Sequence, residues 1–387
     1  MRKVFFIVGM AITFTACHKD NPLQPNPSQV EVYVAGWISD TPEYASEIYP
    51  TYWKNGEVFR LNFDYTMPYD LGKQGWANSI AVSGNDIYVA GHRKQYCYCV
   101  YDLTQGLYWK NGAASEFPGS GLLEGYNQLG QIIISGNDVY TVVREYLASE
   151  NIAQYMKNDN VVILDQGTGP DGSIAESIAV SGNDVYVAGA AIRISRDVGP
   201  LVIGMAKYWK NGIPVNLSDG SASAFATAIV VSGNDIYAAG VIRNGVTDPG
   251  DGYTNRRGIF WKNGVPSYLT DGTTDVSVNA MAISGNDVYI AGTQSDGKLV
   301  NGSRASVAKY WKNGVAIILS DGSNSAEANS IAISGNDVYV AGFEYEGPPL
   351  HNGFPASVAK YWKNGEPVRL SDGTSDAGAN SIFLVTR

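Results

Sequence analysis

The sequence predicts an all-β protein, a seven-bladed β-propeller with four antiparallel strands in each blade. Two short motifs that alternate along the chain support this prediction. The first is Ser-Gly-Asn-Asp followed by an apolar run, as in residues 334–342, and the second is Tyr-Trp-Lys-Asn-Gly, as in residues 52–56. Self-similarity with a period of about 50 residues is typical of propellers and repeat arrays.

The aspartate of the first motif sets the repeat length. It recurs at successive spacings of 52, 46, 51, 52 and 50 residues, at Asp86, Asp138, Asp184, Asp235, Asp287 and Asp337. A truncated copy at residues 32–36 makes seven copies. The second motif also has seven copies, which begin at Tyr52, Tyr108, Tyr155 (a degraded copy), Tyr208, Phe260, Tyr310 and Tyr361. Equal numbers of the two motifs indicate seven structural units.

Each repeat contains four candidate strands. Near the C-terminus these are residues 330–333, 338–341, 357–362 (307–311 one repeat earlier) and 368–370. Gly-Asn joins the first pair and Asn-Gly the second. Both dipeptides suit two-residue primed turns, in which positive φ favours Gly and Asn. The second strand is apolar at successive positions, which indicates a sheet buried on both faces.

The two ends of the chain are complementary. The first repeat lacks the first of its four strands and begins at the second, residues 30–35. Residues 380–385, at the C-terminus, match the beginning of the first strand of a repeat. We therefore expect the C-terminal strand to join the first blade and close the ring. An open solenoid would need polar caps instead.

The composition narrows the range of functions. With 44 Gly, 25 Tyr and 17% charged residues, the chain has the profile of a turn-rich all-β protein. Its formal net charge of −10 speaks against nucleic-acid binding, which needs a basic surface. Only two cysteines, Cys97 and Cys99, follow the N-terminal segment, so disulfides are not expected to hold the fold.

Residues 1–17 resemble the signal peptide of a bacterial lipoprotein. Arg2 and Lys3 precede an apolar run too short to span a bilayer stably. Thr15-Ala16-Cys17 resembles a lipobox, which implies that Cys17 is lipidated; the alternative is an ordinary signal peptide with a chance cysteine. The Pro-rich residues 18–28 are interpreted as a tether. The expected location is the cell envelope, with a lipid anchor as the sole link to the outer membrane.

Residues 329–342, which read Asn-Ser-Ile-Ala-Ile-Ser-Gly-Asn-Asp-Val-Tyr-Val-Ala-Gly, resemble the bacterial β-propeller repeat family. Units of that family combine an apolar strand, a Gly-Asn turn and Val-Tyr-Val-Ala-Gly or Val-Tyr-Val-Thr-Gly. The resemblance covers nearly all of residues 29–387, but Tyr-Trp-Lys-Asn-Gly is not part of the family pattern and indicates a separate branch. It implies the fold and export, but no particular activity.

Antiparallel strands place successive loops on alternate faces of the ring. The near-identical Gly-Asn and Asn-Gly turns should share one face, the uniform face, and the longer irregular loops the other, the variable face. Ligand binding is expected on the variable face, because function on a rigid scaffold concentrates in variable loops. The candidate ligand-binding residues there are Trp37, Tyr44, Tyr96, Tyr98, Arg193, Tyr253, Arg256 and Tyr345. Aromatic rings beside charged groups suit glycans or protein partners; the alternative is that the rings pack their own loops.

The repeated residues are interpreted as structural. One aspartate per repeat should accept backbone N–H bonds in its turn. The Trp of the second motif should pack between blades under the stem of the following Lys, although repeated rings line repeated ligand sites in some lectin propellers. No zinc-ligand spacing is present and residues 248–252 are the best cation candidate, so neither metal nor cofactor is expected.

These observations favour a non-enzymatic, lipid-anchored envelope protein that binds a glycan or a protein through its variable face. The second hypothesis is a polysaccharide lyase or glycoside hydrolase that uses His92 or His351 at the propeller mouth. The third is an architectural subunit of an outer-membrane complex.

Overall fold

The structure is a computed structural model, which describes residues 30–40, 47–63, 73–95, 103–116, 125–147, 151–166, 171–195, 201–244, 254–300, 303–349 and 355–387. Over these residues the chain is all-β, with 28 strands and no helix. The leader and tether, with Cys17, lie outside the described residues, as do Tyr44, Tyr96, Tyr98, Tyr253 and His351.

Four sheets are separate, antiparallel and four-stranded, in chain order. They consist of β12 (Gly172–Ser181), β13 (Asp184–Ser195), β14 (Leu201–Lys210) and β15 (Ile213–Asn216); β16 (Ala224–Ser232), β17 (Asp235–Ile242), β18 (Arg257–Lys262) and β19 (Val265–Tyr268); β20 (Val276–Ser284), β21 (Asp287–Val300), β22 (Ser303–Lys312) and β23 (Val315–Ile318); and β24 (Ala326–Ser334), β25 (Asp337–Pro349), β26 (Pro355–Lys363) and β27 (Glu366–Arg369).

The other twelve strands form one sheet made of three antiparallel groups. These groups are β28 (Ala377–Thr386), β1 (Val30–Ser39), β2 (Ile48–Lys54) and β3 (Glu57–Arg60); β4 (Gln74–Ser83), β5 (Asp86–Gln95), β6 (Leu103–Lys110) and β7 (Ala113–Glu116); and β8 (Gly125–Ser135), β9 (Asp138–Leu147), β10 (Asn151–Lys157) and β11 (Asn160–Gln166). Single parallel pairs, Ile48 with Gln74 and Thr104 with Tyr126, join the groups.

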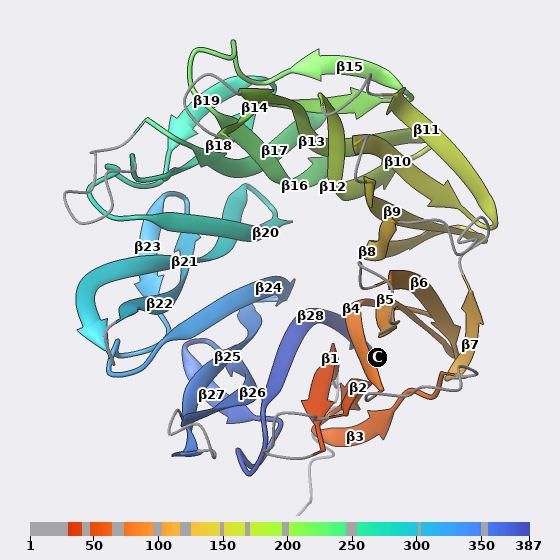
Figure 1. Cartoon of the computed structure of the whole chain (residues 1–387), viewed down its shortest axis with the longest axis vertical. Helices are drawn as coiled ribbons and strands as arrows, with labels where there is room; N and C mark the ends of the chain where they lie inside the picture. The colour runs from red at the N-terminus through yellow and green to blue at the C-terminus, as the bar shows by residue number, and fades with distance from the viewer. Residues whose placement is uncertain are drawn as a thin grey trace, which may run out of the picture.

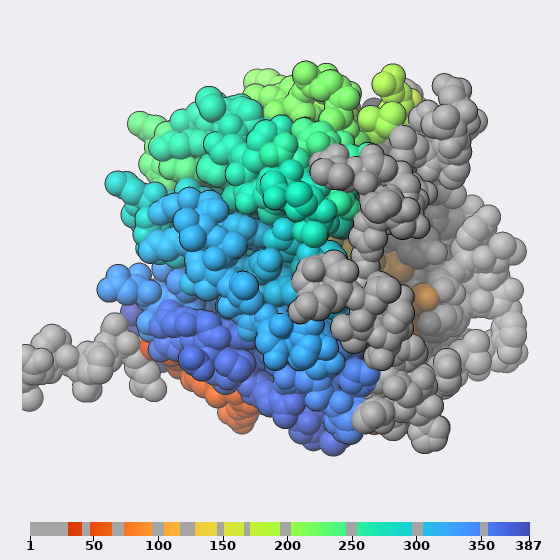
Figure 2. All heavy atoms as spheres, turned by 90° about the vertical axis from the view of Figure 1, so that its left-hand side faces the viewer, coloured from red at the N-terminus to blue at the C-terminus, as the bar shows by residue number. Residues whose placement is uncertain are grey.

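We call each group of four strands a unit and name it after its first strand, from the β4 unit to the β28 unit. Figure 1 shows the units around a common centre, with the first strand of each innermost and the fourth strand outermost. Figure 2 looks onto the outer edges of neighbouring units. This arrangement fits a β-propeller. The first three strands predicted in this repeat lie within longer observed strands; residues 338–341, for example, lie within β25 (Asp337–Pro349). The fourth, predicted at residues 368–370, is instead β27 (Glu366–Arg369), which ends before Leu370.

Both two-residue turns have the predicted primed geometry. In the Asn-Gly turns both residues have positive φ, for example 50° at Asn211 and 82° at Gly212, as in a type I′ turn. In the Gly-Asn turns only the glycine has a positive φ, for example 59° at Gly182, as in a type II′ turn.

A side-chain clamp ties the two turns of a unit together on the uniform face. In the β12 unit, Asn211 accepts a bond from the Val185 N–H (2.9 Å) and donates to Asp184 (2.7 Å). Lys210 forms an ion pair with Asp184 (2.8 Å) and lies 5.3 Å from the centre of the Tyr186 ring. The units of β4, β8, β16, β20 and β24 repeat this clamp around Asp86, Asp138, Asp235, Asp287 and Asp337. In the β28 unit Glu31 replaces the aspartate.

The structural interpretation of the repeated residues is confirmed, but their predicted partners are wrong. The aspartate accepts bonds from side chains of the second motif, because the asparagine of that motif already takes the backbone N–H. The motif lysine covers a tyrosine instead of the Trp, because adjacent strand residues point to opposite faces. The Trp side chains are at most 1% exposed and pack between units; they are Trp53, Trp109, Trp209, Trp261, Trp311 and Trp362.

The core lies between adjacent units, and one junction contains both ends of the chain. Ile331 of β24 packs in a cluster with Val338, Val340, Trp362, Tyr289, Ala291, Ala308, Leu319, Ala326 and Ala328. Ile382 of β28 packs among the residues at the matching positions one unit further, Val32, Val34, Trp53, Tyr339, Ala341, Ala359, Leu370, Ala377 and Ala379. The strand that ends the chain is therefore packed like a first strand in mid-chain.

Candidate functional site

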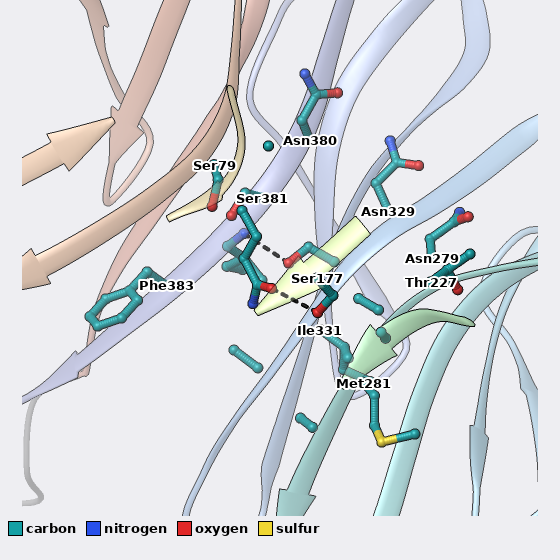
Figure 3. A pocket seen from close by; sticks show the side chains of 18 of the residues that line it. Ser79, Ser177, Thr227, Asn279, Met281, Asn329, Ile331, Asn380, Ser381 and Phe383 are labelled. Carbon is teal, nitrogen blue, oxygen red and sulfur yellow. Dashed lines mark hydrogen bonds between the residues drawn. The ribbon is translucent and has the colours of Figure 1, made fainter. Parts of the chain in front are cut away.

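A hollow of about 920 Å³ lies at the common centre of the units. The first strands of all described units line it, and Figure 3 shows part of this lining. Its volume is in the range of ligand pockets.

Each first strand carries a β-bulge that faces this hollow. In β4 the ladder passes from Ala77 to Ser79 and leaves Asn78 unpaired. A bulge re-aims the side chain of its extra residue. The hydrogen-bonding side chains at the seven bulges, which we call the polar ring, are Asn78, Gln131, Glu176, Thr227, Asn279, Asn329 and Asn380, and all of them line the hollow.

The polar ring links neighbouring units through hydrogen bonds to backbone carbonyls. The Nδ2 of Asn380 donates to Ala77 O (3.0 Å), and that of Asn78 to Leu129 O (2.8 Å). Asn279, Asn329 and Thr227 donate in the same way to Ala328 O, Ala379 O and Val278 O. Within the described residues, the Oδ1 atoms of Asn279, Asn329 and Asn380 make no hydrogen bond, and they can therefore accept one from a ligand.

The β8 and β12 units depart from this pattern. Glu176 cannot donate, and it forms an ion pair with Arg144 (2.5 Å). Gln131 accepts bonds from the Ser177 hydroxyl (2.8 Å) and the Ile178 N–H (2.9 Å). The polar ring is therefore chemically asymmetric, with contiguous asparagines on one side and an ion pair on the other.

His92, a candidate catalytic residue in the enzyme hypothesis, lies beside the polar ring. Burial, assisted by the charge of Arg144, lowers the pKa of His92 to about 4. Its ring stacks on Trp76, with centroids 4.9 Å apart, and its Nδ1 lies 3.1 Å from the Nδ2 of Asn78. Since an amide NH₂ can only donate, Nδ1 is the acceptor. His92 is thus neutral at pH 7 and a weak base.

A second hollow of about 670 Å³ adjoins the first, and the two share Asn279, Glu327 and Asn329. Its wall contains Arg256, which donates to both carboxylate oxygens of Asp275. Burial alone would raise the pKa of Asp275, but the bonds from Arg256 lower it. The buried Oγ1 of Thr293, which also lines this hollow, has no hydrogen-bond partner within the described residues.

Glu327, which lines both hollows, differs from the other carboxylates near it. Among the described residues it has no hydrogen bond or ion pair, and burial raises its pKa. Phe343 lies opposite it across the ladder between β24 and β25, so both side chains are on one face of the sheet. Tyr345 packs edge-on against Phe343, with centroids 5.6 Å apart. Burial, and then the charge of Glu327, raise the pKa of Tyr345.

Four of the eight candidate ligand-binding residues lie within the described part of the chain. Arg256 lines the second hollow. Tyr345 is 38% exposed and lines neither hollow, but it packs against Phe343, which lines the first. Trp37 packs closely against Gly378: a Cβ added to Gly378 would lie 2.6 Å from the indole Nε1 of Trp37. Arg193 is exposed on β13 and lines neither hollow. The structure therefore places one of the four, Arg256, in the lining of the connected hollows.

Neither Glu327 nor the polar ring is among the residues predicted from the sequence. A signal for the ring was present, because an asparagine precedes Ser-Ile at residues 78, 329 and 380, but nothing in the alternation of residues indicates a bulge. No other repeat has an acidic residue at the position of Glu327, and this difference is the feature by which the sequence could have identified it.

Within the described ranges, no three His, Cys, Asp or Glu side chains are grouped as metal ligands. The same part of the chain contains no helix with the length and hydropathy of a membrane span.

No protein-family model matches the sequence, and no curated protein does. Solved structures are similar in fold. Acylaminoacyl peptidase from Pyrococcus horikoshii is 13% identical with a TM-score of 0.47, over 89% of this chain and 51% of the peptidase, so the chain spans about half the length of that protein. The β-propeller domain of the Trilobed protease from Pyrococcus furiosus is 9% identical with a TM-score of 0.46, over 90% of this chain and 97% of that domain. Trypanosoma rangeli sialidase is 8% identical with a TM-score of 0.43, over 87% and 67% of the two chains. Likeness of this strength says nothing about activity.

Proposed function

We propose that the protein is a closed, seven-bladed propeller of the cell envelope that binds a glycan at its two connected hollows. The observation that supports glycan binding is their lining, which contains the unpaired amide oxygens of Asn279, Asn329 and Asn380, the carboxyl of Glu327 and the ring of Phe343. The exposed, amphipathic ring of Tyr345 packs edge-on against Phe343. Sugar hydroxyls both donate and accept hydrogen bonds, and an amphipathic aromatic side chain suits a ligand with polar edges and apolar faces.

Three features support ring closure by the C-terminal strand. β28 pairs with β1 from Val30 with Thr386 to Ile38 with Ala377. Beyond it, Asn380 donates to Ala77 O and the Ser381 hydroxyl accepts from the Ile80 N–H (3.4 Å) in the β4 unit. The core around Ile382 matches that around Ile331.

The entry of the chain into the fold fits the proposed lipid anchor at Cys17. β1 begins at Val30, and the next residue, Glu31, belongs to the clamp of the uniform face. A tether of residues 18–29 attached there would reach about 40 Å if fully extended. The variable face would then point away from the membrane, toward ligands.

Glycan-array binding of residues 21–387, followed by calorimetry on the glycans retained, tests the proposal. We expect saturable binding without new reducing ends or unsaturated products, and weaker binding by Phe343→Ala, because Phe343 lines the first hollow. Arg193→Ala is the matched control, because Arg193 lines neither hollow and should leave affinity unchanged. Turnover of a bound glycan would replace the binding function with the enzymatic one, and absence of all binding would refute the proposal.

The architectural function is a second candidate, because the outermost strands expose large apolar side chains. Ile213, Val265 and Val315 are 67–68% exposed at matching positions of the β12, β16 and β20 units, where the β24 and β28 units have Glu366 and Glu57. Exposed apolar patches are typical of partner interfaces. Co-purification of a membrane partner that is lost in Val265→Glu, without glycan binding by the wild type, would support this function.

A further inference from the structure

Glu327 presents an uncompensated negative charge to the hollows, whereas the two carboxylates of the adjacent strand β25, Glu344 and Glu346, are neutralised by ion pairs within the fold. Glu344 is ion-paired with Lys360 (2.8 Å), and Glu346 with the same lysine (2.7 Å) and with Arg369 (3.0 Å). Within the described residues, Glu327 has neither cation nor donor. A partly buried carboxylate in this state gains most from a cationic ligand group, because desolvation has weakened its interactions with water.

The side chains beside Glu327 indicate which cationic group of a ligand would bind there. Phe343 faces the hollow across the ladder from Glu327, and Tyr345 stands edge-on to it. An aromatic face beside a carboxylate binds an ammonium group through charge and cation–π attraction together. The formal net charge of the protein, −10, also favours the approach of a cation.

The remaining surface of the hollows distinguishes an amino sugar from a basic peptide. Next to Glu327 on β24, Asn329 leaves its Oδ1 unbonded, and so do Asn279 on β20 and Asn380 on β28. The second hollow adds Ser277. These groups match the hydroxyls of a sugar ring, whereas the alkyl stem of a lysine side chain would leave them without partners.

We infer that the glycan site prefers a sugar unit with a free amino group, bound with its ammonium against Glu327 and its hydroxyls toward the asparagines of the polar ring. This inference rests on the proposed glycan-binding function and specifies its ligand class. It also assigns Glu327 as the residue that determines specificity.

A pair of ligands that differ in the amine alone tests the inference. The tetramer of β-1,4-linked glucosamine and its fully N-acetylated counterpart are titrated into the protein by calorimetry, at about pH 6, where an amine carries its charge. The wild type should bind the free-amine tetramer at least tenfold more tightly. Glu327→Gln should abolish this preference and leave the affinity for the acetylated tetramer nearly unchanged.

Glu366→Gln is the matched control for the change in net charge. Glu366 is exposed on the outermost strand β27 and lines neither hollow, so this variant should retain the full preference. Equal wild-type affinity for the two tetramers, or a preference that survives Glu327→Gln, would overturn the inference while glycan binding itself stands. If a lysine-rich peptide binds in a Glu327-dependent manner and neither tetramer binds, the site takes a cation but the amino-sugar assignment is wrong. If no glycan of any kind binds, the proposed function fails together with the inference.

Discussion

Ring closure predicts that two isoleucines far apart in the sequence are energetically equivalent. Ile331 and Ile382 each follow a serine in a first strand, and each side chain is 6% exposed. Their surroundings correspond residue by residue, but the cluster around Ile382 joins the two ends of the chain. If β28 is part of the native ring in solution, Ile382→Ala and Ile331→Ala should destabilise the protein equally.

The expected magnitude follows from burial. Replacing Ile by Ala removes three carbon atoms, worth about 2.4 kcal/mol at about 0.8 kcal/mol for each buried methylene. The cavity that remains adds to this loss, so each variant should lower the free energy of unfolding by about 3 kcal/mol, within the usual range of about 2 to 5 kcal/mol. The two values should agree within about 1 kcal/mol, since context changes such values even at matched sites.

Urea unfolding monitored by the fluorescence of the buried Trp side chains gives both free energies, provided that the m-value does not change. A cost below about 1 kcal/mol for Ile382→Ala, next to a full cost for Ile331→Ala, would refute closure. It would mean that β28 is docked too weakly for its packing to contribute to stability.

Three further variants test other parts of the structure. Asn211→Ala removes both hydrogen bonds of a clamp and puts Ala at a φ of 50°, which Asn tolerates better than Ala. It should cost about 2 kcal/mol in urea unfolding. Asn211→Gly, which loses the same bonds but tolerates that φ, should cost less. Lys360→Met leaves Glu344 and Glu346 without their shared cation and should lower the free energy of unfolding by about 3 to 5 kcal/mol. Adding Glu344→Gln should restore part of this stability. If it restores none, the packing of the lysine stem matters more than its charge. Because burial raises the pKa of Glu327, its ionised form opposes folding at neutral pH. Glu327→Gln should therefore melt at a higher temperature at about pH 7 and lose this advantage below the unfolded-state pKa of about 4.3, whereas a variant that melts lower at pH 7 would indicate an overlooked partner.

The strands and turns were predictable because they depend on local chemistry that recurs. A Gly-Asn or Asn-Gly dipeptide between apolar runs specifies its turn wherever it stands, and seven copies removed the ambiguity of each one. The site was not predictable in this way. Asn78 reads as an ordinary strand residue, because a bulge is a relation between two strands and leaves no mark on the alternation of either. The charge state of His92 depends on burial and on Arg144, which a distant part of the sequence supplies. Lys360 reads as a surface residue, but it is 2% exposed because β25 supplies two carboxylates.

The polar ring limits how function can be tested in this fold. Three of its asparagines, Asn279, Asn329 and Asn380, use their Nδ2 donors to hold neighbouring units together and keep their Oδ1 atoms unbonded within the described residues, so in the proposed site one residue would serve both stability and binding. A loss of binding in Asn329→Ala could therefore arise from a loosened junction as readily as from a lost ligand contact. Glu327 separates the two effects, because it makes no bond within the described residues and its charge weakens the fold. A substitution there that stabilises the protein and still abolishes recognition of an amine has one explanation, which is that the carboxylate binds the ligand.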